Sequence, residues 1–568
     1  MLRPAALALA LLALAPGSAA AAAPPACPGR AMQPDRVITG EFGVELNKSY
    51  VLLPFDVPRG TTAVRVKYCW DRPESGSSRH TLDLGLYEPR HGHSPLWAER
   101  EFRGWGGSSH PDVTVSPEGF SSEADYTANP RIEVPGKTTR AFLPGPIRQG
   151  LWAVELGVGA VIPQSEGDVD GKVAWRVEIE LEDDPSFADE PYRPARYDSG
   201  PVRRDPGWYA GDFHVHAEHS AYGNATMSET FGYAFRPLAQ GGAGLDFITL
   251  SDYVSGSAWG EIGRYQPLFP SNLIVPSDEV ITYRGHTNNH GSQHFVDYRT
   301  GPIYERRDDG SLIRLSGGRR PSEIFEEVHR FGGWTQVNHP TIWPPTNPVV
   351  AAFCRGCFWE YSDAETDWSQ VDAYEIATGP SDVGGTQNGF TVTAIDAYER
   401  LLGLGFKIAA VGSSDSHEAG SGSGPLFAPV GEATTVVYAP ELSVRALRCA
   451  VEARHTYVKV PGNAAPDLRF TARPYRSRQR AIMGDVVHAS GARFRARVIG
   501  GSGRQLLVVK DGLTVATVPV TSDDFVYRFK GDGSGRWRLQ LMRGTLIDDV
   551  SSPIWIESGR GWVASRCR

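Results

Sequence analysis

Hydrophobic and polar positions follow three successive patterns along the chain. From about residue 35 to residue 185, short runs that alternate between apolar and polar residues, such as residues 173–181, are separated by Gly and Pro. Period-two alternation between turn residues is typical of strands with one buried face. This part of the chain therefore predicts an N-terminal β-sandwich over residues 35–185. Residues 186–206, which are rich in Pro and Asp, predict a linker.

The pattern changes in residues 207–460, where short apolar runs alternate with helical segments. Residues 245–250 and 408–411 are two such runs, and residues 321–330 predict a helix with Pro at its start and basic residues in its last turn. Alternating strands and helices over about 250 residues favour a parallel (β/α) barrel. Alternation with period two returns in residues 465–558 and predicts a smaller C-terminal β-sandwich. The fold class expected is multidomain α/β plus β, a barrel flanked by two β-sandwiches.

The first 23 residues differ from everything that follows. A basic residue at position 3, a short run of Leu and Ala, and a string of small residues are typical of a secretory signal peptide. The apolar run is shorter than the about 20 residues that a membrane span needs, and no comparable run occurs later. We expect an exported protein, periplasmic or secreted, with a signal peptide over residues 1–23 and no transmembrane segment.

Export permits disulfides among the six cysteines. Cys354 and Cys357 are separated by two residues, a spacing found in redox pairs, in half of a zinc site and in small disulfide-closed loops. No second pair with this spacing completes an all-cysteine zinc site, and the flanking sequence is not that of a strand followed by a helix. The sequence therefore favours the disulfide-closed loop.

The net charge of the chain limits the kinds of molecule that it is expected to bind. The 568 residues include 57 Lys and Arg against 66 Asp and Glu, a net charge of −9, which is the wrong sign for a protein that coats nucleic acid. With 40% hydrophobic residues, the chain has enough apolar material for several buried cores. We expect a small-molecule partner and no nucleic acid binding, and the sequence leaves the oligomeric state open.

Candidate chemistry lies at or directly after the apolar runs of the middle region. The polar residues in these places are His214, His216, Asp252, Glu279, His286, His339, Asp415 and His417. Barrel enzymes carry their active sites at the carboxyl ends of the strands, so residues far apart in the sequence are expected to converge there. Imidazoles and carboxylates gathered in this way are typical of a metal site.

Five motifs in this order resemble the polymerase and histidinol phosphatase (PHP) superfamily, and most closely its CehA/McbA-like metallohydrolase branch. They lie in residues 211–220, 245–252, 278–286, 337–340 and 411–417. The resemblance implies a distorted, usually seven-stranded barrel that binds two or three divalent ions such as Zn, Mn or Fe. By motif position, one ion would be held by His214, His216, Glu279 and Asp415. Glu279 would bridge to a second ion held by His286 and His339, and His417 would complete the site or contact substrate.

One motif departs from the family pattern, which usually ends in Asp-His where this chain has Asp252 and Tyr253. Tyrosine is a poor ligand near neutral pH, because its pKa is about 10. The departure favours two ions over three, with Tyr253 as a donor to the substrate or leaving group. Asp252 is expected to orient a histidine or to act as an acid or base, in preference to binding metal directly. With His417, these two residues form the predicted catalytic set.

The sequence thus predicts an exported metal-dependent hydrolase in which a metal-bridged hydroxide cleaves a phosphoester. One alternative keeps the metal site but places a carboxyl or carbamate ester in it. A phosphate substrate calls for an arginine-lined pocket, with Arg264, Arg284 and Arg355 near the motifs, whereas a carbonyl substrate calls for an aromatic one. A second alternative is a non-catalytic protein that binds glycans or other material of the cell envelope.

Overall fold

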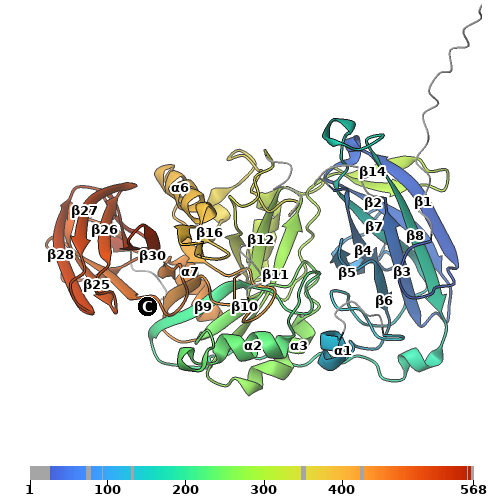
Figure 1. Ribbon diagram of the computed structural model, residues 1–568, viewed down its shortest axis with the longest axis horizontal. Coiled ribbons are helices and arrows are strands. Elements are labelled where there is room, and N and C mark those ends of the chain that lie inside the picture. The colour runs from blue at the N-terminus through green and yellow to red at the C-terminus, as the bar shows by residue number, and fades with distance from the viewer. Residues whose placement is uncertain are drawn as a thin grey trace, which may run out of the picture.

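A computed structural model describes residues 26–71, 79–92, 94–128, 134–346, 354–421, 428–559 and, for the backbone alone, 561–563. The predicted signal peptide, residues 1–23, lies outside the described residues. The molecule is rich in β-structure and elongated, with the N-terminal strands at one end, the C-terminal strands at the other and a mixed α/β region between them (Figure 1). Within the described part of the chain, no helix is long and apolar enough to cross a membrane.

The N-terminal region consists of two sheets that share one core. The four-stranded sheet has the order β1 (Arg36–Gly43), β8 (Lys172–Glu182), β3 (Ala63–Trp70), β6 (Asp112–Val115). The six-stranded sheet has the order β14 (Leu312–Ser316), β13 (Ile303–Arg306), β2 (Ser49–Val57), β7 (Gly150–Ala160), β4 (Thr81–Tyr87), β5 (Phe102–Gly107). Apolar side chains from both sheets, Trp152 and Trp175 among them, are buried together. A short helix, α1 (Glu123–Ala128), follows β6.

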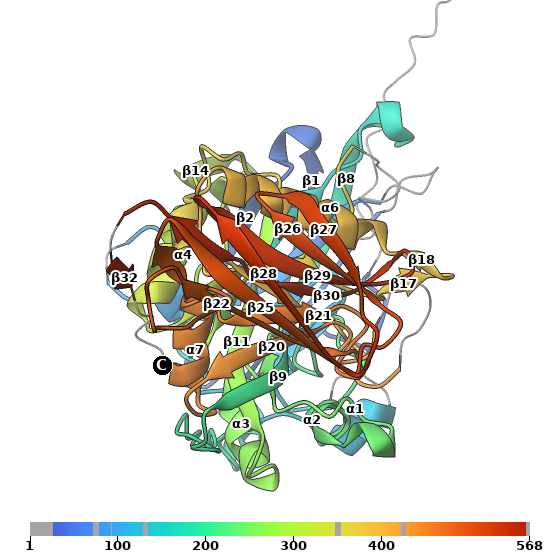
Figure 2. The same cartoon turned by 90° about the vertical axis from the view of Figure 1, so that its left-hand side faces the viewer.

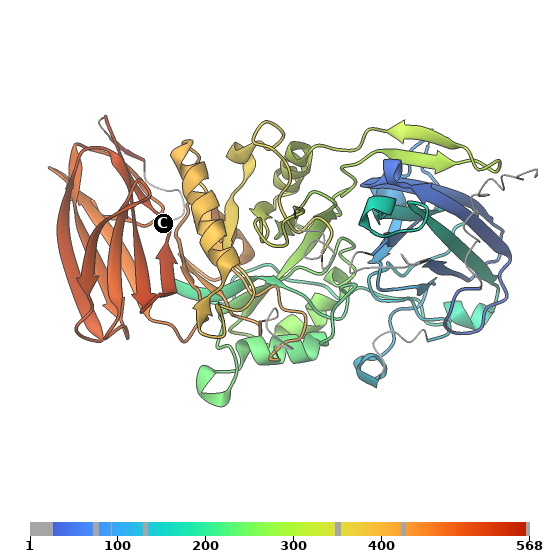
Figure 3. The same cartoon turned by 45° about the horizontal axis from the view of Figure 1, so that its top comes forward.

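The hairpin β13–β14 is the unexpected part of this region. It comes from the middle of the chain, yet β13 pairs in parallel with β2, about 250 residues earlier. In Figure 3 the two strands, in yellow-green, reach from the middle region over the blue N-terminal strands. This pairing joins the middle and N-terminal regions by backbone hydrogen bonds. The sequence of two short strands with a polar face does not indicate so distant a partner.

Seven strands form the sheet of the middle region. Their order is β19 (Ala409–Gly412), β16 (Ala373–Ala377), β15 (Trp334–Val337), β12 (Gly285–His290), β11 (Leu273–Thr282), β10 (Phe247–Leu250), β9 (Gly207–Val215). Pairing is parallel within β9–β10–β11 and within β15–β16–β19, but β12 runs antiparallel to both neighbours. Only Tyr283 and Arg284 separate β11 from β12, too few residues for a parallel crossover. The expectation of an all-parallel sheet is wrong at β12.

The two ends of this seven-strand order meet at the carboxyl ends of β9 and β19. Val215 forms a parallel bridge with Ser416, and the amide of Asp415 donates to the carbonyl of His214 at 2.9 Å. The accompanying helices are α2 (Met227–Phe235), α3 (Trp259–Tyr265), α4 (Pro321–Arg330), α6 (Gly389–Gly403) and α7 (Val444–Glu452). Helix α4 has the bounds predicted from the sequence. A two-strand ribbon, β17 (Asp382–Val383) and β18 (Thr386–Gln387), precedes α6.

The C-terminal region continues the middle sheet. β20 (Thr434–Ala439) pairs with β9, β21 (Thr456–Lys459) pairs with β20, and β30 (Leu546–Ser551) pairs with β21. Beyond β30 lie β29 (Gly535–Arg543), β31 (Ile554–Glu557), β24 (Val486–His488) and β32 (Gly561–Val563), with β26 (Gln505–Lys510) and β27 (Leu513–Pro519) branching from β29. A second sheet contains β23 (Ala481–Ile482), β22 (Asp467–Pro474), β25 (Gly491–Ile499) and β28 (Asp524–Asp532). Figure 2 shows these strands running lengthwise across the view, in front of the middle region.

Two disulfides join described cysteines. Cys27 is bonded to Cys69, which ties the start of the chain to β3, and Cys354 is bonded to Cys357. The second bond confirms the small disulfide-closed loop favoured by the sequence.

Candidate metal centre

Six of the predicted residues converge at one end of the middle sheet. They are His214 in β9, His216 just after it, Glu279 in β11, His286 in β12, His339 after β15 and Asp415 after β19. Because β12 is antiparallel, its first residues lie beside the carboxyl end of β11, which places His286 with the others. The four histidines and Glu279 are buried, and the Asp415 side chain is 25% exposed. The cluster therefore opens to solvent on the Asp415 side.

Within the cluster, the ligand atoms of His214, His216 and Asp415 lie within 4.8 Å of one another, and so do those of His214, Glu279 and His339. His214 Nε2 lies 3.4 Å from Glu279 Oε2 and 3.4 Å from Asp415 Oδ1. His216 Nε2 lies 3.6 Å and 3.1 Å from the same two oxygens. Distances of 3.1–3.6 Å between donor atoms are those of neighbouring ligands around one divalent ion. His214 Nε2 is also buried and makes no hydrogen bond, so the donor set fits a divalent ion.

The other oxygen of Glu279 faces a different pair of imidazoles. Oε1 lies 3.2 Å from His286 Nδ1 and 3.1 Å from His339 Nε2. The side-chain amide of Asn338 donates to the same oxygen at 2.9 Å. Since Oε2 faces His214 and His216, the carboxylate of Glu279 has the arrangement of a bridge between two positions.

Electrostatics favour ionised carboxylates in this cluster. Burial opposes the ionisation of Glu279, but His214 and His286 outweigh burial and hold its pKa well below the ordinary value. Burial likewise opposes the ionisation of Asp415, and His214, His216 and His417 lower its pKa. Burial disfavours a charged imidazole, and it lowers the pKa of His216 to about 3. Burial opposes a charged His214 and His339, but Asp415 and Glu279 outweigh burial and raise the pKa of both imidazoles. A bound cation would take the place of these protons, because metal ligands must be deprotonated.

Two of the candidate ligands stand on strained backbone. Asp415 has φ 54° and His339 has φ 27°, in the left-handed region that non-glycine residues rarely adopt. The His339 amide donates to Glu375 Oε2, and the His339 ring lies 3.1 Å through Nδ1 from the carbonyl oxygen of Cys357. Such conformations persist where surrounding bonds fix them, and they concentrate at functional sites.

Two buried carboxylates outside the predicted site set contact the cluster. Glu375, on β16, approaches His214 Nδ1 with Oε1 at 3.5 Å, while its other oxygen binds the His339 amide. Asp212 accepts from the amides of His214 and Ser414 at 3.1 Å each and from Gly431 at 2.7 Å. A charged residue within a buried strand was the available signal for both, but their partners come from other strands.

Tyr253 and His417 lie together at the edge of the cluster. Tyr253 Oη is 2.7 Å from His417 Nε2, and His417 Nδ1 is 3.0 Å from the carbonyl oxygen of Asp415. The His417 ring stacks on His216 with centroids 4.1 Å apart. Since both nitrogens of His417 have partners, it lies beside the ligand groups and belongs to none of the metal-ligating groups found among the described residues.

Asp252 belongs to none of the groups of described residues that could hold a metal ion. It is fully buried, Oδ1 accepts from the Ala217 amide at 2.7 Å, and Oδ2 has no hydrogen-bond partner. Burial raises the pKa of Asp252 to about 8, with Glu218 adding to the effect. Its hydrogen bond is thus to the backbone of Ala217, the residue directly after His216.

The N-terminal region forms one side of the site. Trp105, on β5, meets the Tyr253 ring edge to face at 6.2 Å, and Tyr222 meets it at 6.3 Å. The hydroxyls of Ser109 and Tyr126 donate to carbonyls at Ala221 and Gly223. These contacts hold residues 221–223, which lie in the connection between His216 and α2.

A pocket of about 800 Å³ is lined by residues that follow His417 in the chain, and by none of the candidate metal ligands. Its lining includes Glu418 and Ser421 after His417, and Ser228, Tyr233 and Arg236 on or after α2. The amide of Asn224, also in the lining, donates to the carbonyl of His417 at 2.8 Å. The pocket is thus continuous in sequence and hydrogen bonding with the edge of the cluster.

The three arginines named from the sequence lie elsewhere. Arg264 pairs with Glu261, and Arg284 pairs with Glu365 through both terminal nitrogens. Arg355 donates to the carbonyl of Arg79 and lines a second pocket, of about 280 Å³, with Lys48 and Glu360. Arg236 is the guanidinium that the structure places in the pocket beside His417.

Comparisons with known proteins assign no family. No family model matches the chain. No curated protein matches it either. Among solved structures, it is similar to a two-domain protein from Bacteroides vulgatus containing a predicted PHP-like metal-dependent phosphoesterase. The identity is 15%, the match covers 64% of this chain and 99% of that one, and the TM-score is 0.32. A similarity at this level gives neither a fold nor an activity to the chain.

Proposed function

We propose that the chain is a metal-dependent hydrolase of PHP type that cleaves phosphoesters, with the seven strands from β9 to β19 as its barrel. The observation that carries the proposal is the position of Glu279. Its two oxygens face two separate pairs of buried imidazoles, and Asp415 completes the first set. This is the arrangement of a two-ion site with a bridging carboxylate.

Under this proposal, His214, His216, Glu279 and Asp415 hold one ion, and Glu279, His286 and His339 hold the other. When bound there, two divalent ions, Zn, Mn or Fe, would supply Lewis acidity and would lower the pKa of water from 15.7 to about 7. Glu375 and Asn338 orient the ligands, because they bind the His339 amide and Glu279 Oε1.

The chain itself supplies a place for a proton beside the ligands. His417 Nδ1–H donates to the Asp415 carbonyl, so Nε2 accepts from the Tyr253 hydroxyl. The proton between Tyr253 Oη and His417 Nε2 lies at the edge of the cluster, where a leaving oxygen needs one. We assign proton donation to this pair, while Asp252 fixes the backbone of Ala217.

The pocket formed by the residues after His417, which none of the candidate ligands lines, supports a phosphoester through one side chain. Arg236 lines it, and a guanidinium binds phosphate oxygens through two parallel N–H groups. A separate observation supports a second candidate function. Trp105 and Tyr222 pack against Tyr253 and give the site an aromatic side. That side fits a carboxyl or carbamate ester.

Domain organisation and location form part of the proposal. We infer two β-sandwich domains, residues 35–185 and 465–558, on either side of a hydrolase domain, residues 207–460, and export from the cytoplasm. The Cys27–Cys69 disulfide supports export, because such bonds persist in oxidising compartments.

Hydrolysis of one aryl phosphate and one aryl carboxylate ester tests the proposal. Turnover is expected to stop after a chelator removes metal, to return with Mn²⁺ or Zn²⁺, and to be faster for the phosphate. His216→Ala should abolish it, whereas His488→Ala, the same change on β24, should leave it unchanged. Faster chelator-sensitive turnover of the carboxylate ester would select the second function, and chelator-resistant turnover would overturn both.

A further inference from the structure

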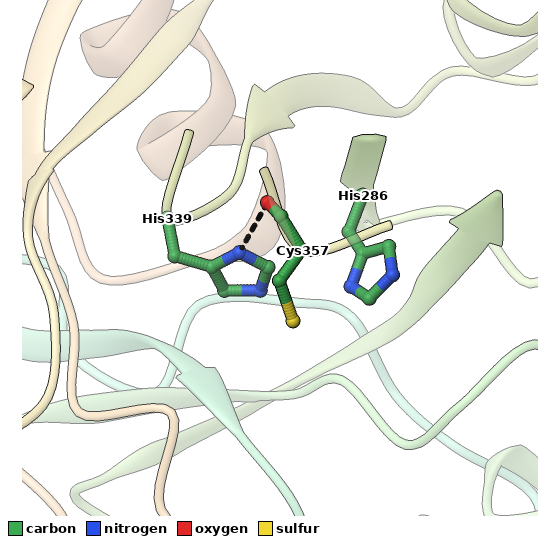
Figure 4. Close-up of side chains that lie close together, drawn as sticks. All are labelled: His286, His339 and Cys357. Atoms are coloured by element: carbon green, nitrogen blue, oxygen red, sulfur yellow. Dashed lines mark hydrogen bonds between the residues drawn. The ribbon is translucent and has the colours of Figure 1, made fainter. Parts of the chain in front are cut away.

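A sulfur atom lies within the second half of the candidate metal centre. Cys357 Sγ and one ring nitrogen each from His286 and His339 lie within 4.8 Å of one another, and all three residues are buried. Figure 4 shows the Cys357 side chain projecting between the two imidazole rings. Two imidazoles and a thiolate are a common donor set for zinc and related ions.

The backbone holds this sulfur in place. The Cys357 carbonyl oxygen lies 3.1 Å from His339 Nδ1, so one residue both orients the imidazole and presents the sulfur. The neighbouring Gly356 has φ 92°, and a Cβ there would lie 2.1 Å from the Thr282 carbonyl oxygen. The loop therefore packs tightly against the turn between β11 and β12, the hairpin that carries Glu279 and His286.

The same sulfur is shared with a disulfide. Cys357 is bonded to Cys354, three residues earlier. A metal ligand must be a thiolate, and a disulfide sulfur carries no charge to offer a cation. Ligation by Cys357 and the Cys354–Cys357 bond therefore exclude each other.

We propose that the Cys354–Cys357 disulfide is a redox switch that controls metal binding by His286, His339 and Glu279. That these residues bind a metal ion rests on the proposed function. A dithiol reductant transfers two electrons and two protons to the disulfide, which yields two thiols and the oxidised reductant. The Cys357 thiol then loses its proton to solvent on ligation, and Cys354 stays a thiol. The reduced protein holds a borderline or soft ion through His286, His339, Glu279 and Cys357.

Two matched variants separate the states of the switch. Cys354→Ser leaves Cys357 as a free thiol, Cys357→Ser leaves Cys354 as one, and neither forms the disulfide. Both substitutions leave the cysteines of the Cys27–Cys69 bond untouched. Thermal unfolding of each variant checks the fold, and wild type reduced with a dithiol gives the same test without a substitution.

Titration with Co²⁺ reads the ligand directly, because a thiolate bound to Co²⁺ gives a charge-transfer band in the near ultraviolet. The band is expected for Cys354→Ser and for reduced wild type, and not for Cys357→Ser or oxidised wild type. Competition with a chelator should show at least about tenfold tighter Zn²⁺ binding for Cys354→Ser than for Cys357→Ser.

The outcomes distinguish this proposal from the one on which it rests. Co²⁺ binding without the band in Cys354→Ser and reduced wild type would overturn the switch and leave the metal centre standing. No Co²⁺ binding by any form would overturn both proposals.

Discussion

At the scale of single residues, the proposed proton donor, Tyr253, lies beside the candidate ligands. The Tyr253 hydroxyl lies 2.7 Å from His417 Nε2, and the His417 ring stacks on His216. Burial raises the pKa of Tyr253 well above its ordinary value, with Glu279 and Asp415 adding to the effect. The phenol therefore keeps its proton at neutral pH, as a donor requires.

Replacing Tyr253 by Phe removes the hydroxyl and keeps the ring. Because general acid catalysis contributes about 10²–10⁴-fold, kcat is expected to fall by about 100-fold with metal content unchanged. Steady-state kinetics and metal analysis check this, with Tyr438→Phe on β20 as the control. An unchanged kcat would remove Tyr253 from catalysis, and loss of metal would make it a ligand.

The sequence indicated the candidate ligands more readily than the residues that contact them. His214, Glu279 and Asp415 were identifiable because they lie at the ends of strands and in motifs. Asn338 was given no role, because its partner, Glu279 Oε1, becomes a neighbour only when separate strands pair. Cys357 was assigned to its disulfide but not to the cluster, for the same reason.

At the scale of elements, one carboxylate joins the two ends of the seven-strand order. Asp212 lies in β9 and accepts from Ser414, just after β19, and from Gly431. It thereby sets the distance between His214 and Asp415, which stand on these two segments. The sequence predicted the strands but not the antiparallel β12, because a two-residue connection reverses a chain whose pattern otherwise alternates strand and helix.

Asp212→Asn tests this junction. An amide presents N–H groups where the carboxylate accepted three N–H donors, and a buried donor without an acceptor costs about 1–3 kcal/mol. The free energy of unfolding in urea should fall by that amount, and metal affinity should fall with it. Asp308→Asn, at a fully exposed side chain, is the control. Unchanged stability would show that Asp212 does not hold the junction.

On the scale of the whole molecule, buried polar contacts join the N-terminal sheet to the middle region. Arg299 pairs with Glu155 of β7 at 3.2 Å, with both side chains fully buried. Tyr283, between β11 and β12, donates to Asp83 of β4 at 2.6 Å. With the hairpin β13–β14, these contacts connect the N-terminal sheet to the strands that carry Glu279. A sequence pattern shows that such residues are polar, but it does not show which residues they contact.

Asp83 makes the stability of this junction depend on pH. Burial raises the pKa of Asp83 to about 7, whereas an unfolded aspartate has a pKa of about 3.9. Between these values the folded chain holds a proton that the unfolded chain has lost. The contribution of Asp83 to stability is therefore fully present below about pH 4 and is lost as the pH rises through 7.

Asp83→Asn should flatten this dependence. Three pKa units correspond to about 4 kcal/mol at most, so the wild type should lose up to that much relative to the variant between pH 4 and pH 7. Urea unfolding at several pH values measures the difference, with Asp308→Asn again as the control. Parallel pH profiles for wild type and Asp83→Asn would show that Asp83 is not the titrating group.

The two-ion site bridged by Glu279 is tested most directly by counting metal ions per chain. Protein purified without chelator, loaded with Zn²⁺ or Mn²⁺ and freed of excess ion is analysed beside Glu279→Gln and Glu326→Gln, the second on the outer helix α4. About two ions are expected in the wild type and in Glu326→Gln, and at most one in Glu279→Gln, because the bridge loses its charge. Two ions retained by Glu279→Gln, or none held by the wild type, would contradict the site.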